Sequence, residues 1–483
     1  MTNETANYLL LTLFPALGWA ETFNQPITER TTIEPTLKVA QPVAPAPVVV
    51  IRNQENQPIE LSEAELKANP TLTQQLLSQA IYARHPEIIG KLLAVYQTFP
   101  QTDPILIQFA QGKIFALTGE HHKAVEQYRA ILAKQPELNP VRFELATSLF
   151  YDKQLSAAED QFNKVKTDPN MPAEVQQMAD DYLESIQKSS EWHFSASSHY
   201  VRDSNVNNVS NARNIENTGY VKNDNMMPET AHGIAYSVNF GKDFNLGGRH
   251  YLAFDNDFYG KSYWDNHDYD DWNNRTYLGY RYKTHSATLS ILPFYEKRWY
   301  GNESYQWSNG VRAELSKWLN SHWQIVTALE HGKQRYFDST AQNSNSKLAS
   351  ATLVWIRNPK QFFTLGADFN REKTWVKQYS SDTKGLRLSW GQEWELGGIS
   401  SRLSFGISQR QYKDQAKLGG LLNLGKVRKD NIYSASLTLW KRDWHLWGIT
   451  PKLQLSWRKN DSNLPTMYSY SRKNANLIFE KTF

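Results

Sequence analysis

The sequence predicts a multidomain α plus membrane β protein, in which a short tetratricopeptide-like α-solenoid precedes an antiparallel transmembrane β-barrel of about 14 strands. Two segments match when they are offset by 34 residues, which indicates helical repeats. Residues 191–483 fall into segments of alternating polar and apolar character, and the chain ends on Phe483. Because a strand points successive side chains to opposite sides, this alternation suits a wall between lipid and a polar lumen.

The first 60 residues predict a leader and a linker rather than part of a core. An apolar run from Tyr8 to Leu17 precedes Gly18-Trp19-Ala20, which places small residues where a signal peptidase cuts. Residues 1–20 are therefore expected to be a signal peptide, although no basic residue precedes the apolar run. Residues 21–60 are rich in proline without core periodicity, which favours an extended tether.

The composition narrows the class of protein. The 53 basic and 49 acidic residues give a net charge of +4, which is too balanced to indicate nucleic acid as a partner. The chain has no cysteine, which excludes disulfides and thiolate metal sites. Fifteen of the 16 tryptophans lie at or beyond Trp192, in a chain of mean hydropathy −0.62. Aromatic residues gathered in one half of a polar chain fit the two interfacial belts of a membrane barrel.

Residues 61–189 are expected to form the helical domain. Matched positions share their residue types: Gly112, Phe115, Ala124, Tyr128 and Ile131 correspond to Ala146, Leu149, Ala158, Phe162 and Val165. The small residues among them let paired helices approach, while Phe115, Tyr128 and Phe162 fill the space between successive hairpins. Period and residue types resemble the tetratricopeptide repeat. An ordinary helical bundle with accidental similarity is the alternative.

A solenoid of this kind lines a concave surface with the first helix of each pair. Side chains expected to point from that surface toward a protein partner are Phe109, Lys113, Phe143, Thr147, Phe150 and Tyr151. The alternative is that the aromatic residues of this set belong to the core.

Residues 190–483 are expected to form the barrel. The predicted strands are 191–201, 231–244, 249–263, 273–283, 285–298, 306–317, 322–335, 346–357, 361–375, 382–394, 398–413, 430–443, 447–458 and 468–483. Short and long connections alternate between them, with the long ones at 202–230, 264–272, 299–305, 336–345, 376–381, 414–429 and 459–467. Outer-membrane barrels have short periplasmic turns and longer outside loops, so both barrel ends and the helical domain are predicted to lie in the periplasm.

The last strand carries a second signal. Leu477, Phe479 and Phe483 share one face and form the pattern by which outer-membrane barrels are usually recognised for insertion. They also suit a lipid-facing surface, and both roles are compatible.

Signs of catalysis are scarce. The acidic run 265–272 lacks the glycine-centred spacing of a calcium loop, so a solvated outside loop is the favoured interpretation. His121 and His122 are interpreted as exposed turn histidines, because spacing supplies no third metal ligand. The sequence therefore predicts no enzyme, no cofactor and no metal site, and a chance catalytic arrangement on a barrel enzyme stays an alternative.

The order of signal peptide, tether, tetratricopeptide-like domain and barrel resembles the surface lipoprotein assembly modulator family. This resemblance covers nearly the whole chain beyond residue 60 and depends on domain order, size and strand count. It implies an outer-membrane translocator of a Gram-negative cell that moves client lipoproteins, or secreted haem- or iron-binding proteins, from the periplasm to the surface. Implied partners are the client, outer-membrane lipid, periplasmic chaperones and the barrel-insertion machinery.

Two further functions remain as alternatives. An exopolysaccharide export porin also joins such repeats to a barrel, but it typically has many more repeats and is expected to have a strongly charged lumen. A passive porin with a helical accessory domain is the second. No phosphate-binding glycine loop ending in Lys-Ser or Lys-Thr is present in the sequence, so energy for transport would come from client folding outside.

Overall fold

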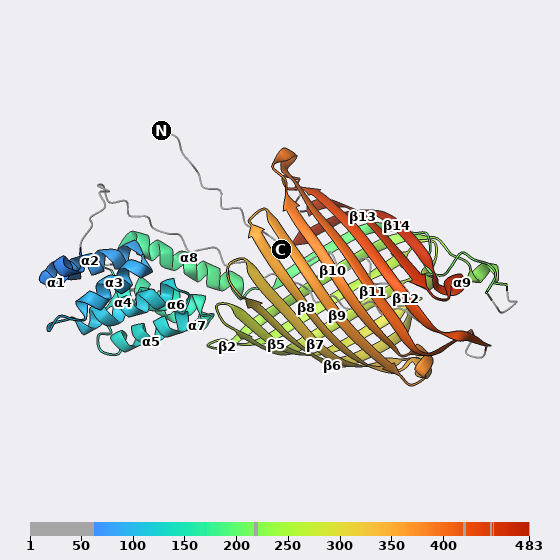
Figure 1. Cartoon of the computed structure of the whole chain (residues 1–483), viewed down its shortest axis with the longest axis horizontal. Coiled ribbons are helices and arrows are strands. Elements are labelled where there is room, and N and C mark those ends of the chain that lie inside the picture. The colour runs from blue at the N-terminus through green and yellow to red at the C-terminus, as the bar shows by residue number, and fades with distance from the viewer. Residues whose placement is uncertain are drawn as a thin grey trace.

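A computed structural model describes residues 62–169, 171–216, 221–418, 422–444, 447 and 449–482. The predicted signal peptide, the tether and Phe483 lie outside the described residues. A helical domain stands at one end of a β-barrel, as Figure 1 shows. The two-part fold predicted from the sequence is confirmed.

The helical domain consists of helix pairs followed by one longer helix. Its helices are α1 (Glu63–Ala68), α2 (Pro70–Ala83), α3 (Pro86–Tyr96), α4 (Pro104–Leu117), α5 (His121–Leu132), α6 (Asn139–Tyr151), α7 (Leu155–Lys166) and α8 (Ala173–Ser189). Helices α2, α3 and α4 begin with proline, whose fixed φ and missing N–H suit the first turn. Three pairs, α2–α3, α4–α5 and α6–α7, thus stack before α8 ends the series.

Small residues allow close approach inside each pair. Gly112 on α4 lies against Tyr128 on α5, and a Cβ at this glycine would be 2.6 Å from the Tyr128 Cε1 atom. Ala124, Ala146 and Ala158 are fully buried in the main core cluster, as Tyr128 and Phe162 are, and Phe115 packs against its edge. The helix α8 completes this core, because the ring of its Tyr182 stacks on Phe162 at 4.8 Å.

The barrel closes from fourteen antiparallel strands in chain order. They are β1 (His193–Asp203), β2 (Ala231–Gly247), β3 (His250–Tyr263), β4 (Asp271–Lys283), β5 (Ala287–Tyr300), β6 (Glu303–Trp318), β7 (Trp323–Tyr336), β8 (Ser344–Asn358), β9 (Gln361–Thr374), β10 (Ser381–Glu393), β11 (Ile399–Leu418), β12 (Leu422–Lys441), β13 (Ile449–Ser462) and β14 (Tyr470–Thr482). Each strand pairs with its neighbours in sequence, and β1 pairs with β14. The predicted strand number is therefore confirmed.

The strands alternate as the sequence predicts. On β13, Leu453 and Leu455 are more than two fifths exposed on the outside, whereas Lys452 and Gln454 are buried on the inside. On β14, Leu477 and Phe479 also point outward, at 49% and 45% exposure. Their role as an insertion signal stays a prediction.

Two connections differ from the predicted loops. Strands β5 and β6 are joined by a two-residue turn, Gly301-Asn302, with φ of 58° and 64°, so the expected long loop 299–305 is wrong. Positive φ at both positions is the geometry that pairs directly with twisted strands. The expected loop 414–429 is wrong as well, because β11 continues to Leu418 and β12 begins at Leu422.

The helical domain lies on the side of the tight turns. The turn after β2 and the turn after β4 contact it directly, and α8 leads into β1 through residues 190–192. Longer connections at 204–230, 264–270 and 463–469 lie at the other end of the strands. None of the described helices is long and apolar enough to cross a membrane.

Candidate functional site

The helical face predicted to contact a client is partly closed in the structure. Lys113 is 5% exposed and forms an ion pair with Glu144 at 2.5 Å. Phe150 is 4% exposed, because Tyr182 of α8 covers it at a ring distance of 5.0 Å. The expectation that these two side chains point to solvent is therefore corrected: both pack between helices.

The other four side chains of this predicted face are partly buried. Phe109 packs against Tyr128 at a ring distance of 5.7 Å, and Phe143 packs against Tyr182 at 6.3 Å. Thr147 is half-buried on the same helix as Phe143. Tyr151, also half-buried, lies at the end of α6 beside the barrel. Their contact with a client stays a prediction.

The helical domain meets the barrel through the loop between α6 and α7. The side chain of Asp152 is 4% exposed and forms an ion pair with Arg249 in the turn after β2, whose Nε donates to it at 3.0 Å. The next residue, Lys153, accepts a hydrogen bond at its backbone oxygen from the Tyr251 hydroxyl at 2.8 Å. Burial, together with the nearby Lys283, lowers the pKa of Lys153 to about 8. The junction is therefore a buried polar contact.

A histidine pair forms a second contact at this junction. His121, at the start of α5, is 8% exposed, and its ring lies 4.6 Å from that of His285 in the turn after β4. It also stacks on Tyr151 at 5.1 Å. Burial lowers the pKa of His121 to about 4, and His285 acts in the same direction. The interpretation of His121 as an exposed turn residue is wrong, because the barrel turn covers it.

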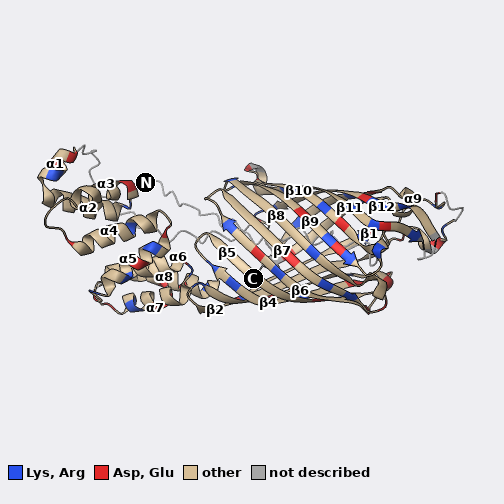
Figure 2. Cartoon of the chain, turned by 60° about the horizontal axis from the view of Figure 1, so that its bottom comes forward, with Lys and Arg blue, Asp and Glu red and all other residues tan. Residues whose placement is uncertain are grey.

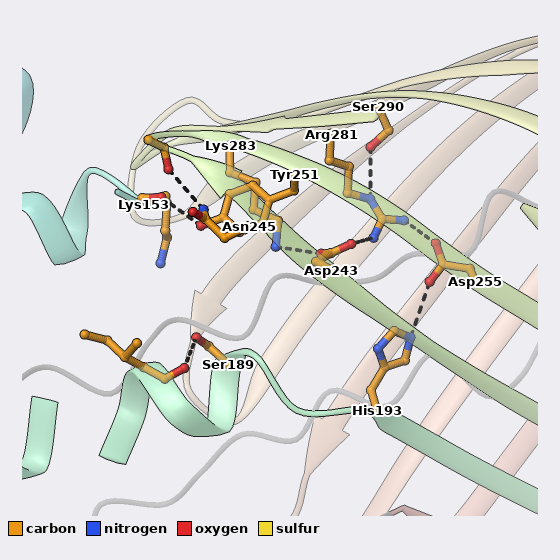
Figure 3. Close-up of polar contacts among 12 residues, drawn as sticks. Lys153, Ser189, His193, Asp243, Asn245, Tyr251, Asp255, Arg281, Lys283 and Ser290 are labelled. Carbon is orange, nitrogen blue, oxygen red and sulfur yellow. Dashed lines mark hydrogen bonds and ion pairs between the residues drawn. The ribbon is translucent and has the colours of Figure 1, made fainter. Parts of the chain in front are cut away.

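A chain of ion pairs continues from the junction along the inside of the barrel wall, as Figure 3 shows. Lys283 binds Asp243 at 2.6 Å, and Asp243 also binds Arg281 at 2.5 Å. The same arginine binds Asp255, which lies 3.4 Å from His193 at the start of β1. The chain thus links β4, β2, β3 and β1 near the helical domain.

A second group of charges is buried deeper in the lumen. Glu330 on β7 forms an ion pair with Arg275 at 2.8 Å and accepts a hydrogen bond from Arg312 at 3.1 Å. Arg275 also binds Glu296 at 3.2 Å and lies 3.8 Å above the ring of Phe294. Both arginines are at most 4% exposed, so neighbouring side chains cover them on the inner face of the wall.

Charges of both signs compensate one another around the barrel. Further pairs near the end of the chain are Arg428 with Asp430 at 2.7 Å, Arg472 with Asp203 at 3.0 Å, and Lys452 with Glu480. Figure 2 shows basic and acidic positions interspersed along the strands. Such a lumen offers hydrogen-bond partners to a polar chain without a strong preference for one sign of charge.

Acidic side chains of the predicted loop 265–272 form hydrogen bonds and ion pairs with other residues of this protein. Asp270 accepts from the Tyr263 backbone at 2.6 Å and lies 3.0 Å from His267. Asp271 binds Arg298 at 2.7 Å. Within the described ranges, no group of three or more His, Cys, Asp or Glu residues is placed to hold a metal ion.

The fold and the lumen define a class: an outer-membrane β-barrel protein with a tetratricopeptide-repeat domain at its mouth. The family model "Surface lipoprotein assembly modifier" matches residues 192–483, and the model for the N-terminal TPR repeats of the same family matches residues 59–162. The chain therefore belongs to the surface lipoprotein assembly modifier family, whose name is that of an assembly factor and not of an enzyme.

Several relatives are similar over nearly their whole length. Surface lipoprotein assembly modifier 1 of Haemophilus influenzae is 34% identical over 462 residues, which cover 93% of each chain. The Moraxella catarrhalis surface lipoprotein assembly modifier is 33% identical and covers 92% of this chain and 88% of its own. The hemophilin secretion modulator of Acinetobacter baumannii is 23% identical and covers 89% of this chain and 87% of its own.

Sequence reasoning missed the junction between the two domains. Asp152 and Arg249 are 97 positions apart, and neither belongs to a motif that indicates its partner. The sequence places His121 at a helix-pair turn, but its partner His285 lies in a turn that carries no separate signal. Lys153 has a positive φ of 63°. A sequence indicates this conformation when glycine or asparagine occupies the position, and lysine gives no such indication.

Proposed function

We propose that this protein moves specific client proteins, either surface lipoproteins or secreted haem- or iron-binding proteins, from the periplasm to the cell surface. The names of its relatives support both kinds of client. The observation that carries the proposal is the docking of a protein-binding type of repeat at the mouth of a closed barrel, through the buried Asp152–Arg249 pair. A domain fixed there presents whatever it binds to the barrel.

In the proposed mechanism, the helical domain captures a client, alone or with a periplasmic chaperone, and the barrel provides its passage. The barrel itself is placed in the membrane by the insertion machinery, with Leu477, Phe479 and Phe483 as the recognised residues. Client folding at the surface supplies the free energy. The protein acts without catalysis and without a cofactor.

The alternatives receive less support from the lumen. An exporter of a charged polysaccharide needs one sign of charge along its path, whereas Arg275, Arg312 and Glu330 here neutralise one another. A passive porin needs no protein-binding type of repeat at its mouth, whereas this chain docks one there through the Asp152–Arg249 pair. No described feature favours a barrel enzyme over these functions.

Surface display of a client tests the proposal. Cells that lack outer-membrane assembly modifiers of this family are given this protein together with one of a panel of epitope-tagged lipoproteins that carry a small β-barrel domain. We expect at least one tagged lipoprotein to become accessible to antibody on intact cells only when this protein is present. If none depends on it, and secreted haem-binding proteins are likewise not released, the proposal is refuted.

The helical domain is then tested with a matched pair of variants. Deletion of residues 62–189 is expected to abolish display while the barrel still shows a heat-dependent shift in gel mobility. Arg249→Asp is expected to reduce display, and Arg249→Asp combined with Asp152→Arg restores it, because the ion pair is rebuilt with reversed charges. Undiminished display in the deletion variant would contradict the capture step.

A further inference from the structure

The barrel is closed by one unusually short seam. Among the described residues, strands β1 and β14 pair at five positions, from Ser195 opposite Thr482 to His199 opposite Ile478. Every other neighbouring pair of strands is joined at eleven or more positions in the described chain. Because each position adds main-chain hydrogen bonds, this seam separates more easily than any other.

The outer half of the seam has two strand edges that do not pair with each other. Residues 200–203 of β1 pair with β2 on one side, and residues 474–477 of β14 pair with β13. Across the seam, no register between these two segments exists within the described residues. An edge of this kind presents N–H and C=O groups to any extended chain that comes beside it.

Side chains hold the outer half together in place of the missing main-chain bonds. Arg472 on β14 binds Asp203 on β1 at 3.0 Å, and the two side chains are 4% and 1% exposed. Beyond the strand ends, the Nζ of Lys222 in the first outside loop donates to the backbone oxygen of Thr466 at 2.6 Å. It also donates to the backbone oxygen of Ser210 at 3.0 Å. Such contacts can exchange one by one, whereas a ladder of main-chain bonds opens as a unit.

The helical domain is attached directly to this seam. Helix α8 ends at Ser189 and β1 begins at His193, so only residues 190–192 connect them. The four residue steps from Ser189 to His193 span at most about 14 Å. A displacement of the helical domain therefore acts first on β1, which forms one side of the seam.

We propose that the seam between β1 and β14 is a docking site for an extended β-strand segment of the client, which joins the barrel wall when the seam parts from its outer half through the paired positions that begin at His199 and Ile478. This inference rests on the proposed function. A strand is the favoured occupant because it satisfies the exposed N–H and C=O groups, which lipid chains cannot do. The outward side chains of Tyr200 and Leu477, 48% and 49% exposed, flank the opening and offer apolar contact to the entering strand.

A disulfide across the seam tests whether it must open. The double variant His199→Cys with Ile478→Cys places cysteines at opposed positions, where Cα atoms of antiparallel strands lie within disulfide range. The chain contains no other cysteine, so the crosslink is unambiguous. The matched control is Ser389→Cys with Ser404→Cys on β10 and β11, where the native hydroxyl oxygens are 3.0 Å apart. Both variants are required to show the normal heat-dependent mobility shift.

We expect the oxidised seam variant to lose at least nine tenths of the client display shown by wild type, and reduction to restore it. The oxidised control is expected to display the client as wild type does. Full display by the oxidised seam variant, in cells where display still depends on this protein, overturns the inference and leaves the proposed function intact. Loss of dependence in wild type would instead refute the proposed function.

Photocrosslinking identifies the occupant independently. A benzoylphenylalanine at Tyr200 is expected to crosslink to the tagged client during transport, whereas the same residue at Tyr295 on β5, 51% exposed, is not. Crosslinks from Tyr200 to a second copy of this chain, or equal client crosslinking from both positions, would contradict a client strand at the seam.

Discussion

Loss of the Arg249 side chain is expected to release the helical domain from its fixed position on the barrel. In Arg249→Ala, Asp152 loses its ion pair while it stays in a contact that leaves its side chain 4% exposed. The carboxylate keeps the hydrogen bond from the Gln154 side chain at 2.7 Å but loses its counter-charge. A buried charge without a counter-charge is unfavourable, so the docked arrangement is weakened more than the lost attraction alone suggests. The hydrogen bond from Tyr251 to Lys153 and the His121–His285 contact remain.

The size of the effect follows from the burial of the pair. Breaking a buried ion pair by removal of one partner costs about 3–5 kcal/mol. The Arg249 side chain is 22% exposed, which places the pair at the boundary with solvent and lowers the expected loss. We therefore expect about 2–4 kcal/mol, and at 1.4 kcal/mol per tenfold change this shifts the ratio of docked to undocked protein by roughly 30- to 700-fold.

Spin labels at Glu159→Cys on α7 and Asn320→Cys in the turn after β6 measure this ratio, because the chain has no native cysteine. Wild type is expected to give one narrow distance distribution, and Arg249→Ala a broad one. The charge-exchanged variant, Asp152→Arg with Arg249→Asp, is the control and is expected to recover the narrow distribution. An equally narrow distribution in Arg249→Ala would refute the assignment of this pair as the main docking contact.

Three other outcomes follow from the same structure. Burial holds the pKa of His121 at about 4, below its ordinary 6.5, so the undocked chain binds the proton first. The contribution of His121 to docking is therefore complete above pH 6.5 and falls by on the order of 3 kcal/mol toward pH 4. His121→Phe is expected to reduce this acid dependence in the spin-label assay and to leave the part carried by His285, whose pKa burial also lowers. Gly112→Ala is expected to destabilise the helical domain by about 1–3 kcal/mol in urea unfolding followed by far-UV circular dichroism, because the new Cβ meets Tyr128. Gly90→Ala, with nothing within 4 Å, is the matched control and is expected to stabilise it by about 0.5–1 kcal/mol. Glu330→Ala leaves two buried arginines without their shared acceptor and is expected to lower the temperature of the heat-dependent mobility shift, whereas an unchanged temperature would contradict a stabilising role.

The barrel wall could be predicted from the sequence because lipid imposes a simple rule on every strand. Outward residues such as Leu453 must be apolar, and inward ones such as Lys452 are free to be polar, so a period of two is visible directly. The rule fails where a strand leaves the membrane. In β11, Asp414, Gln415 and Lys417 place polar side chains on both faces, and the sequence therefore predicts a loop from residue 414.

The junction and the seam could not be predicted in the same way. The pair of Asp152 with Arg249 joins segments 97 positions apart, and each residue alone is an ordinary charge near a turn. Burial of Lys113 and Phe150 depends on the position of other helices, since the repeat pattern does not show which face α8 covers. The short pairing at the seam depends on the register between β1 and β14. Alternation of polar and apolar residues indicates which way a side chain points but not how many positions two strands share.

Comparison of two variants separates capture of the client from positioning of the helical domain. Arg249→Ala removes one docking contact of the domain, yet residues 190–192 still hold the end of α8 within about 14 Å of β1. The freed domain therefore stays at the mouth at nearly its native local concentration, and only its orientation is lost. Deletion of residues 62–189 removes the domain itself, and with it both its local concentration at the mouth and its orientation. Display that falls equally in the two variants means that orientation at the mouth is essential, whereas display that survives in Arg249→Ala alone means that tethered capture is sufficient.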